Sequence, residues 1–199
     1  MKLRITYNAP VVLTFAIAAV AAFVLTQVVP ATGQWFTAYP HLGTAQAYVG
    51  LFTHILGHAS WEHLLGNFML ILLIGPILEE RHGSFRLLLM ILGTALVTGF
   101  VNLAIGSHFL MGASGIAFMM ILLASMANVR GGELPLTFIA VAIIYMGGEI
   151  VHSFNNDNVS HMAHLVGGAV GAAFGFFAAK PKQKSLAKSS SLQASSRTR

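Results

Sequence analysis

The sequence predicts an all-α integral membrane protein, a bundle of six transmembrane helices. The first observation is composition: 56% of the 199 residues are hydrophobic and only 9% are charged, with a mean hydropathy of +0.75. A soluble domain carries far more charge on its surface, so the bilayer is the expected solvent. The second observation is a set of apolar stretches close to the roughly 20 residues that a helix needs to cross the hydrocarbon core. The predicted spans are 10–29, 62–78, 86–105, 114–129, 134–152 and 160–179.

Two of these spans need separate justification. The first follows Lys2 and Arg4 and so resembles a signal peptide, but its apolar run is too long for one, and we expect an uncleaved helix. The fourth has only about 15 residues, or about 23 Å at the helical rise, against a core of about 30 Å. We therefore expect its first residue, Ser114, to lie below the membrane surface.

Lys and Arg residues all fall on one side of the six-span arrangement, at the two ends of the chain and in the loops after spans two and four. The positive-inside rule then predicts cytoplasmic termini, in a bacterial-type inner or plasma membrane. The net charge of +5 does not indicate nucleic acid, because the basic residues flank apolar segments instead of alternating with aromatics.

Three regions follow from this pattern. Residues 1–9 form a cytoplasmic segment, 10–179 the membrane domain, and 180–199 a basic tail, rich in Ser and Lys, that we expect to be disordered. Within the membrane domain, the segment 30–61 is rich in aromatic residues. We expect it to be an external loop in the membrane interface.

Polar residues mark the outer ends of spans two, four and six, which all run in the same direction. Polar side chains at membrane depth are costly and indicate function. Ser114, framed by Gly112 and Gly115, begins span four, and His164 lies about one turn into span six. A serine nucleophile needs a base, which His164 can supply, and a helix N-terminus offers N–H groups to an oxyanion.

Span two adds His63 and Asn67, which share a helix face and can both donate hydrogen bonds. A third, carboxylate member is not evident, since Asp157 lies in a loop and Glu149 near the end of span five. Span six carries small residues every four positions, beginning with Gly167 and Gly171. This spacing lets helix backbones approach closely in lipid.

These residues also allow other interpretations. G-x-S-G and the glycine repeat occur in ordinary helix packing, and His161 is a second candidate base. His58 and His63 suggest a zinc motif at first sight, but they are five residues apart, about 140° around a helix, and not on one face. With no cysteine in the chain either, we expect no metal and no cofactor. The remaining histidines, such as His54, lie in loops or at span ends, where we expect them to be solvated or interfacial.

These motifs together resemble the rhomboid family of intramembrane serine proteases. The segment 58–67, beginning with His58, is similar to the family's H-x-x-x-x-H-x-x-x-N, and 112–115 to its G-x-S-G. The segment 163–171 is similar to A-H-x-x-G-x-x-x-G, and 79–84 to E-x-R-x-G-S. The resemblance implies a six-helix bundle around a short central fourth helix.

The same resemblance implies a Ser–His dyad of Ser114 and His164, and an oxyanion hole of His63, Asn67 and the Ser114 N–H. It implies a structural role for His58 and, as substrates, transmembrane proteins cleaved in or near their membrane helices. Many members carry Tyr one turn after the serine, stacked on the histidine, where this chain has Phe118. Two other functions compete with this one. The chain could be a catalytically silent relative that binds membrane proteins, or a channel or transporter. The sequence does not predict the oligomeric state.

Overall fold

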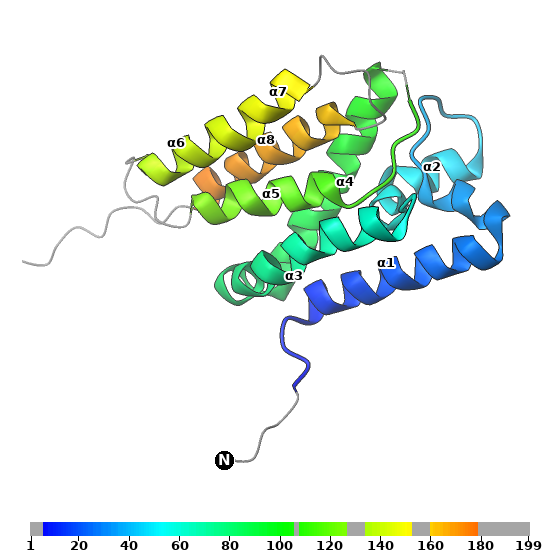
Figure 1. Cartoon of the computed structure of the whole chain (residues 1–199), viewed down its shortest axis with the longest axis horizontal. Helices are drawn as coiled ribbons and strands as arrows, with labels where there is room; N and C mark the ends of the chain where they lie inside the picture. Colours follow the sequence, from blue (N-terminus) through cyan, green and yellow to red (C-terminus); the bar gives the residue numbers. More distant parts are fainter. Residues whose placement is uncertain (1–5, 106–107, 127–133, 153–159, 179–199) are drawn as a thin grey trace, which may run out of the picture.

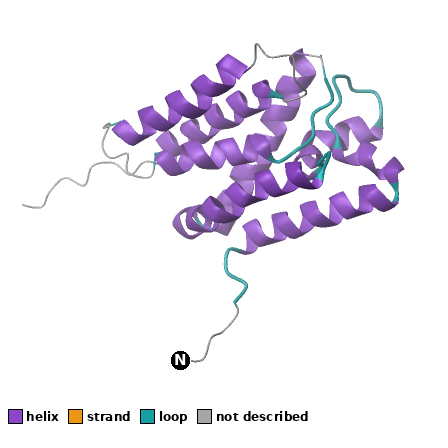
Figure 2. Ribbon diagram, viewed as in Figure 1, coloured by secondary structure: helices purple, strands orange, loops and turns teal. Residues whose placement is uncertain are grey.

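The computed structural model describes residues 6–105, 108–126, 134–152 and 160–178. This part of the chain is helical, apart from loops and one isolated antiparallel bridge between Ala38 and Leu110 (Figures 1 and 2). The predicted tail at 180–199 lies outside the described residues. The elements are α1 (Pro10–Val28), η1 (Pro30–Phe36), α2 (Ala45–Thr53), η2 (His54–Leu56), α3 (Trp61–His82), α4 (Ser84–Ile105), α5 (Ser114–Ser125), α6 (Leu136–Ala142), the π-helical turn η3 (Ile143–Gly147), α7 (Gly148–His152) and α8 (His161–Ala178).

Four helices of the described chain, α1, α3, α4 and α8, are long and apolar enough to cross a membrane. The two other predicted spans correspond to shorter apolar helices, α5 with 12 residues and the stretch from α6 through α7. The all-α, multi-pass character is therefore confirmed. The shortness of the helix that begins at Ser114 is also confirmed, whereas its crossing of the membrane and the count of six crossings stay predictions.

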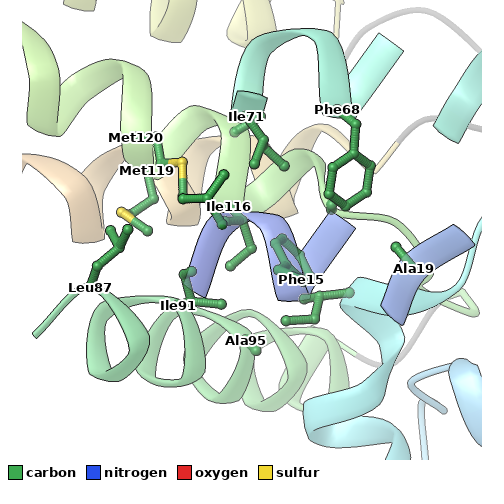
Figure 3. Close-up of a cluster of buried hydrophobic side chains, with 14 of the residues drawn as sticks. Phe15, Ala19, Phe68, Ile71, Leu87, Ile91, Ala95, Ile116, Met119 and Met120 are labelled. Atoms are coloured by element: carbon green, nitrogen blue, oxygen red, sulfur yellow. The ribbon is translucent and has the colours of Figure 1, made fainter. Parts of the chain in front are cut away.

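The main hydrophobic core lies between α1, α3, α4 and α5 (Figure 3). Helix α1 contributes Phe15 and Ala19 to it, α3 contributes Ile71, and α4 contributes Leu87. Most residues of α5 are buried, as expected for a helix enclosed by others. The first helix is thus part of the packed bundle.

A buried carboxylate joins α3 to the start of α1. Glu79 is 3% exposed, and its two oxygens accept hydrogen bonds from the N–H groups of Val11 and Val12, both at 3.0 Å. These N–H groups belong to the first turn of α1, where no intrahelical acceptor exists. Four residues later Gly83, with φ of +84°, ends α3 and allows α4 to begin at Ser84.

Helices α5 and α8 lie side by side (Figure 1). A Cβ atom added at Gly167 would overlap the carbonyl group of Gly115, and one at Gly171 would overlap that of Met119. The two backbones are therefore in direct contact. This confirms the close approach predicted from the four-residue spacing of small residues in the last span.

The segment 30–61 is folded, with η1, α2 and η2 inside it, and is not the simple loop expected from its composition. His54 is 1% exposed, so the prediction that it is solvated or interfacial is wrong. Its Nδ1 lies 3.0 Å from the Gly50 carbonyl and its Nε2 3.3 Å from the Thr98 hydroxyl on α4. These partners satisfy both nitrogens of the ring, which allows the ring to be buried. The spacing of residues in the sequence does not reveal such partners.

Candidate functional site

Ser114 is the first residue of α5, directly after a tight turn. Gly112 has φ of +126°, a backbone conformation that favours glycine, and its N–H donates to the His54 carbonyl at 2.9 Å. The turn thus depends on the buried segment before α3. At the start of a helix the first N–H groups have no intrahelical acceptor, so they can stabilise negative charge near Ser114.

His164 lies in the first turn of α8, and its ring stacks on Phe118 with centroids 4.5 Å apart and planes 5° apart. Phe118 follows Ser114 by four residues and shares its helix face. One residue before His164, the Ala163 carbonyl lies 3.3 Å from where a Cβ of Gly115 would sit. Ser114 and His164 therefore lie at the same level of the α5–α8 contact.

Helix α3 brings His63 and Asn67 to the other side of this turn. A Cβ added at Gly112 would lie 2.8 Å from the His63 imidazole and 3.7 Å from the Asn67 amide nitrogen. A side chain at this position would therefore displace the His63 ring, and the positive φ favours glycine independently.

His58 holds the Asn67 amide in one orientation. Its Nδ1 lies 3.2 Å from the Leu56 carbonyl, which can only accept, so Nδ1 carries the proton. Burial lowers the pKa of His58 to about 4, so the ring is neutral and its Nε2 accepts. Nε2 receives hydrogen bonds from Asn67 Nδ2 at 3.1 Å and from the Ala113 N–H at 3.4 Å. The second N–H of the Asn67 amide remains available to another acceptor.

The carboxylate of Glu149 lies against His164, although the sequence pattern did not make a third, carboxylate member evident. Glu149 Oε2 is 2.9 Å from Nδ1 of His164 and 2.7 Å from Nδ1 of His161. The preceding π-helical turn η3 inserts an extra residue into the helix. One residue rotates everything after it by about 100°, so a regular helical wheel places Glu149 on the wrong face.

These three side chains also form a group with metal-ligand chemistry. One ligand atom from each of Glu149, His161 and His164 lies within 4.8 Å of the others. Two imidazoles and a carboxylate are a donor set that zinc accepts. The expected absence of a metal therefore stays a prediction.

The fold and the site together define a class of protein. It is a multi-pass helical membrane protein with a serine at the head of a buried short helix and a histidine in direct contact with that helix. The chain belongs to the rhomboid family: residues 45–181 match the Rhomboid domain. This match covers well over half of the chain and confirms the resemblance seen in the motifs.

Individual relatives agree with the family match. The chain is 32% identical over 130 residues to Rhomboid-related protein 1 of Caenorhabditis elegans, covering 60% of this chain and 36% of that protein. It is 30% identical over 145 residues to the putative rhomboid protease YdcA of Bacillus subtilis, covering 67% and 69%. It is 24% identical over 137 residues to the rhomboid protease GlpG of Haemophilus influenzae, covering 67% and 71%. The chain thus spans about a third of the length of the nematode protein and about 70% of the two bacterial ones.

Proposed function

We propose that the chain is an intramembrane serine endopeptidase that hydrolyses peptide bonds in or near the transmembrane segments of membrane proteins. The observation that carries the proposal is the placement of His164, stacked on Phe118 at the level of Ser114. One relative is named as a rhomboid protease and another as a putative rhomboid protease, which supports the same reaction. Substrates would enter from the lipid bilayer, and the reaction needs no cofactor.

In this mechanism His164 Nε2 takes the proton of the Ser114 hydroxyl as Ser114 Oγ attacks the scissile carbonyl carbon. The carbonyl oxygen becomes an oxyanion, which the Ser114 N–H, the Asn67 amide and His63 stabilise by donating hydrogen bonds. The protonated His164 gives its proton to the leaving amine, and an acyl ester remains on Ser114. Water, activated by the same histidine, then hydrolyses the ester and restores the serine.

The remaining residues of the site would support these groups. His58 fixes the Asn67 amide through the 3.1 Å contact, and Gly112 and Gly115 permit the turn and the helix approach. Phe118 holds the His164 ring by stacking. Gly167 and Gly171 keep α8 against α5. We assign all of these a structural role and none a chemical step.

The test is cleavage of a single-span membrane protein by the purified chain in detergent or liposomes, beside Ser114→Ala and His164→Ala. We expect cleavage by the wild type and none above background by either variant, with all three folded equally well. A folded wild type that cleaves no more than Ser114→Ala would favour the silent, binding relative. If His164→Ala stayed active and His161→Ala did not, the base would be His161.

A further inference from the structure

The carboxylate of Glu149 is enclosed in an apolar helix bundle, where a charge is costly without partners. Its side chain is 14% exposed, and those of His161 and His164 are 11% and 12% exposed. The cost is offset by the two imidazoles of α8, whose Nδ1 atoms both lie within hydrogen-bond distance of Oε2. One of these imidazoles belongs to the proposed base.

The π-helical turn η3 brings two groups to His164 at once. Tyr145, within the turn, packs edge-on against Phe118 with centroids 5.9 Å apart. Phe118 in turn stacks on His164. Glu149, two residues after the turn, lies at the Nδ1 edge of the same His164 ring, 2.9 Å from that nitrogen. π-Helical turns are rare and often occur at functional sites.

We infer that Glu149 is a positioning residue for His164, a third member that orients the base of the proposed Ser114–His164 dyad. The inference rests on the proposed function. A carboxylate facing Nδ1 accepts the proton carried there, which leaves Nε2 bare and able to take the Ser114 proton. When His164 becomes an imidazolium, Glu149 stays ionised and balances its charge. No proton passes to the carboxylate.

The distances favour direct contact between the carboxylate and the two imidazoles over a metal site. Ligand atoms that share one tetrahedral zinc, each at about 2.0–2.1 Å from the ion, are about 3.3 Å apart. Here the carboxylate oxygen is 2.7 Å from one Nδ1 and 2.9 Å from the other. The 2.7 Å contact to His161 is a hydrogen bond, and the 2.9 Å contact to His164 is an ion-pair distance that leaves no room for a shared ion.

The test compares Glu149→Gln, Glu149→Asp and His161→Gln by steady-state cleavage kinetics. Ser114→Ala serves as the inactive reference that gives the background rate. Glu149→Gln keeps the shape and removes the charge. We expect kcat to fall on the order of 10²-fold with KM little changed; a fully buried triad aspartate replaced by asparagine costs about 10⁴. Glu149→Asp should recover part of kcat. His161→Gln is the matched control, since it removes the other partner of the same carboxylate, and we expect it to stay within about 3-fold.

Three outcomes would overturn the inference. The first is a Glu149→Gln variant with the kcat of the wild type. The second is a fall of kcat in His161→Gln as large as that in Glu149→Gln. The third is a loss of activity on chelation that added zinc restores, since that result would make the three residues a metal site. NMR of ¹⁵N-histidine-labelled protein separates this inference from the proposed function. The Nδ1–H signal of His164 should be present in the wild type and shift strongly in Glu149→Gln alone. If the wild type shows this signal but never cleaves, the proposed function fails and the contact stands; without the signal, the inference fails.

Discussion

The contacts that α1 makes with α3 differ in kind from those that α5 makes with α8. Side chains join α1 to α3: Phe15 packs on Phe68 with centroids 5.2 Å apart, and Phe23 on Trp61 at 4.6 Å. Main chain joins α8 to α5, where Gly167 and Gly171 lie against carbonyl groups. A side chain can adjust its rotamer when a neighbour changes, whereas a backbone in contact with a backbone cannot.

This difference matters because the proposed nucleophile and base lie on the rigid α5–α8 contact. Ser114 and His164 come from the two helices whose backbones are in direct contact. Pre-organised geometry of this kind is what covalent catalysis needs. Substitutions at the α5–α8 contact should therefore affect turnover, and substitutions at the α1–α3 contact should affect stability.

The largest effect is expected at Gly171. Even the methyl group of Gly171→Ala would overlap the Met119 carbonyl and force α8 away from α5. A displacement of about 1 Å can cost on the order of 10² in rate, so we expect at least that loss in kcat/KM, and inactivation in Gly171→Leu. The measurement is cleavage kinetics together with a thermal midpoint in detergent.

Gly93 on α4 supplies the control for this prediction. A Cβ added there would meet only the Phe174 ring, at an ordinary 3.8 Å. Gly93→Ala should keep its activity and gain about 0.5–1 kcal/mol from helix propensity. Equal tolerance at both glycines would refute the idea that α8 is held by backbone contact.

The second largest effect, a fall in kcat of about 10²-fold, is expected on substitution of Asn67. This residue lies on α3 next to Phe68 of the α1–α3 contact, and its amide lies near Gly112 in the turn before Ser114. Asn67→Ala removes a proposed oxyanion donor, and such losses cost about 10²–10³ in kcat. Since the Ser114 N–H and His63 remain, we expect the lower end, with KM nearly unchanged and a lower thermal midpoint, because the buried His58 Nε2 loses its 3.1 Å donor. A rise in KM at constant kcat would instead make Asn67 a substrate-positioning residue.

The smallest effect on turnover, but a clear one on stability, is expected at Glu79. Glu79→Gln keeps one acceptor oxygen and places an amide N–H₂ against the second N–H of α1. An unsatisfied buried donor costs about 1–3 kcal/mol, so the thermal midpoint should fall while kcat per folded molecule stays unchanged. Its exposed neighbour serves as the control: Glu80→Gln should leave both quantities unchanged. A loss of kcat without loss of stability in Glu79→Gln would place the carboxylate in the chemistry.

The sequence predicts the parts of this protein that depend on regular periodicity. The long helices, the short helix beginning at Ser114 and the glycine face around Gly167 all follow from apolar length and four-residue spacing. The positions of His63 and Asn67 beside Gly112 follow from the common direction of alternate spans. Each of these inferences needs only a regular helix.

The features that the sequence did not predict depend on breaks in regular structure. Glu149 reaches His164 because of the π-helical turn η3, which no helical wheel anticipates. His54 is buried because α2 and η2 fold the first loop against α4. Glu79 was noticed within a motif, but its contact with the first turn of α1 joins residues 67 and 68 positions apart. Long-range contacts of this kind leave no local signal.

The central claim is that His164 activates Ser114, and covalent labelling with a fluorophosphonate tests it most directly. The reagent forms a stable adduct only with an activated serine. We predict a single adduct on Ser114, located by peptide mass spectrometry, that is absent in Ser114→Ala and reduced to background in folded His164→Ala. Labelling of a different serine, or undiminished labelling of Ser114 in His164→Ala, would contradict the account.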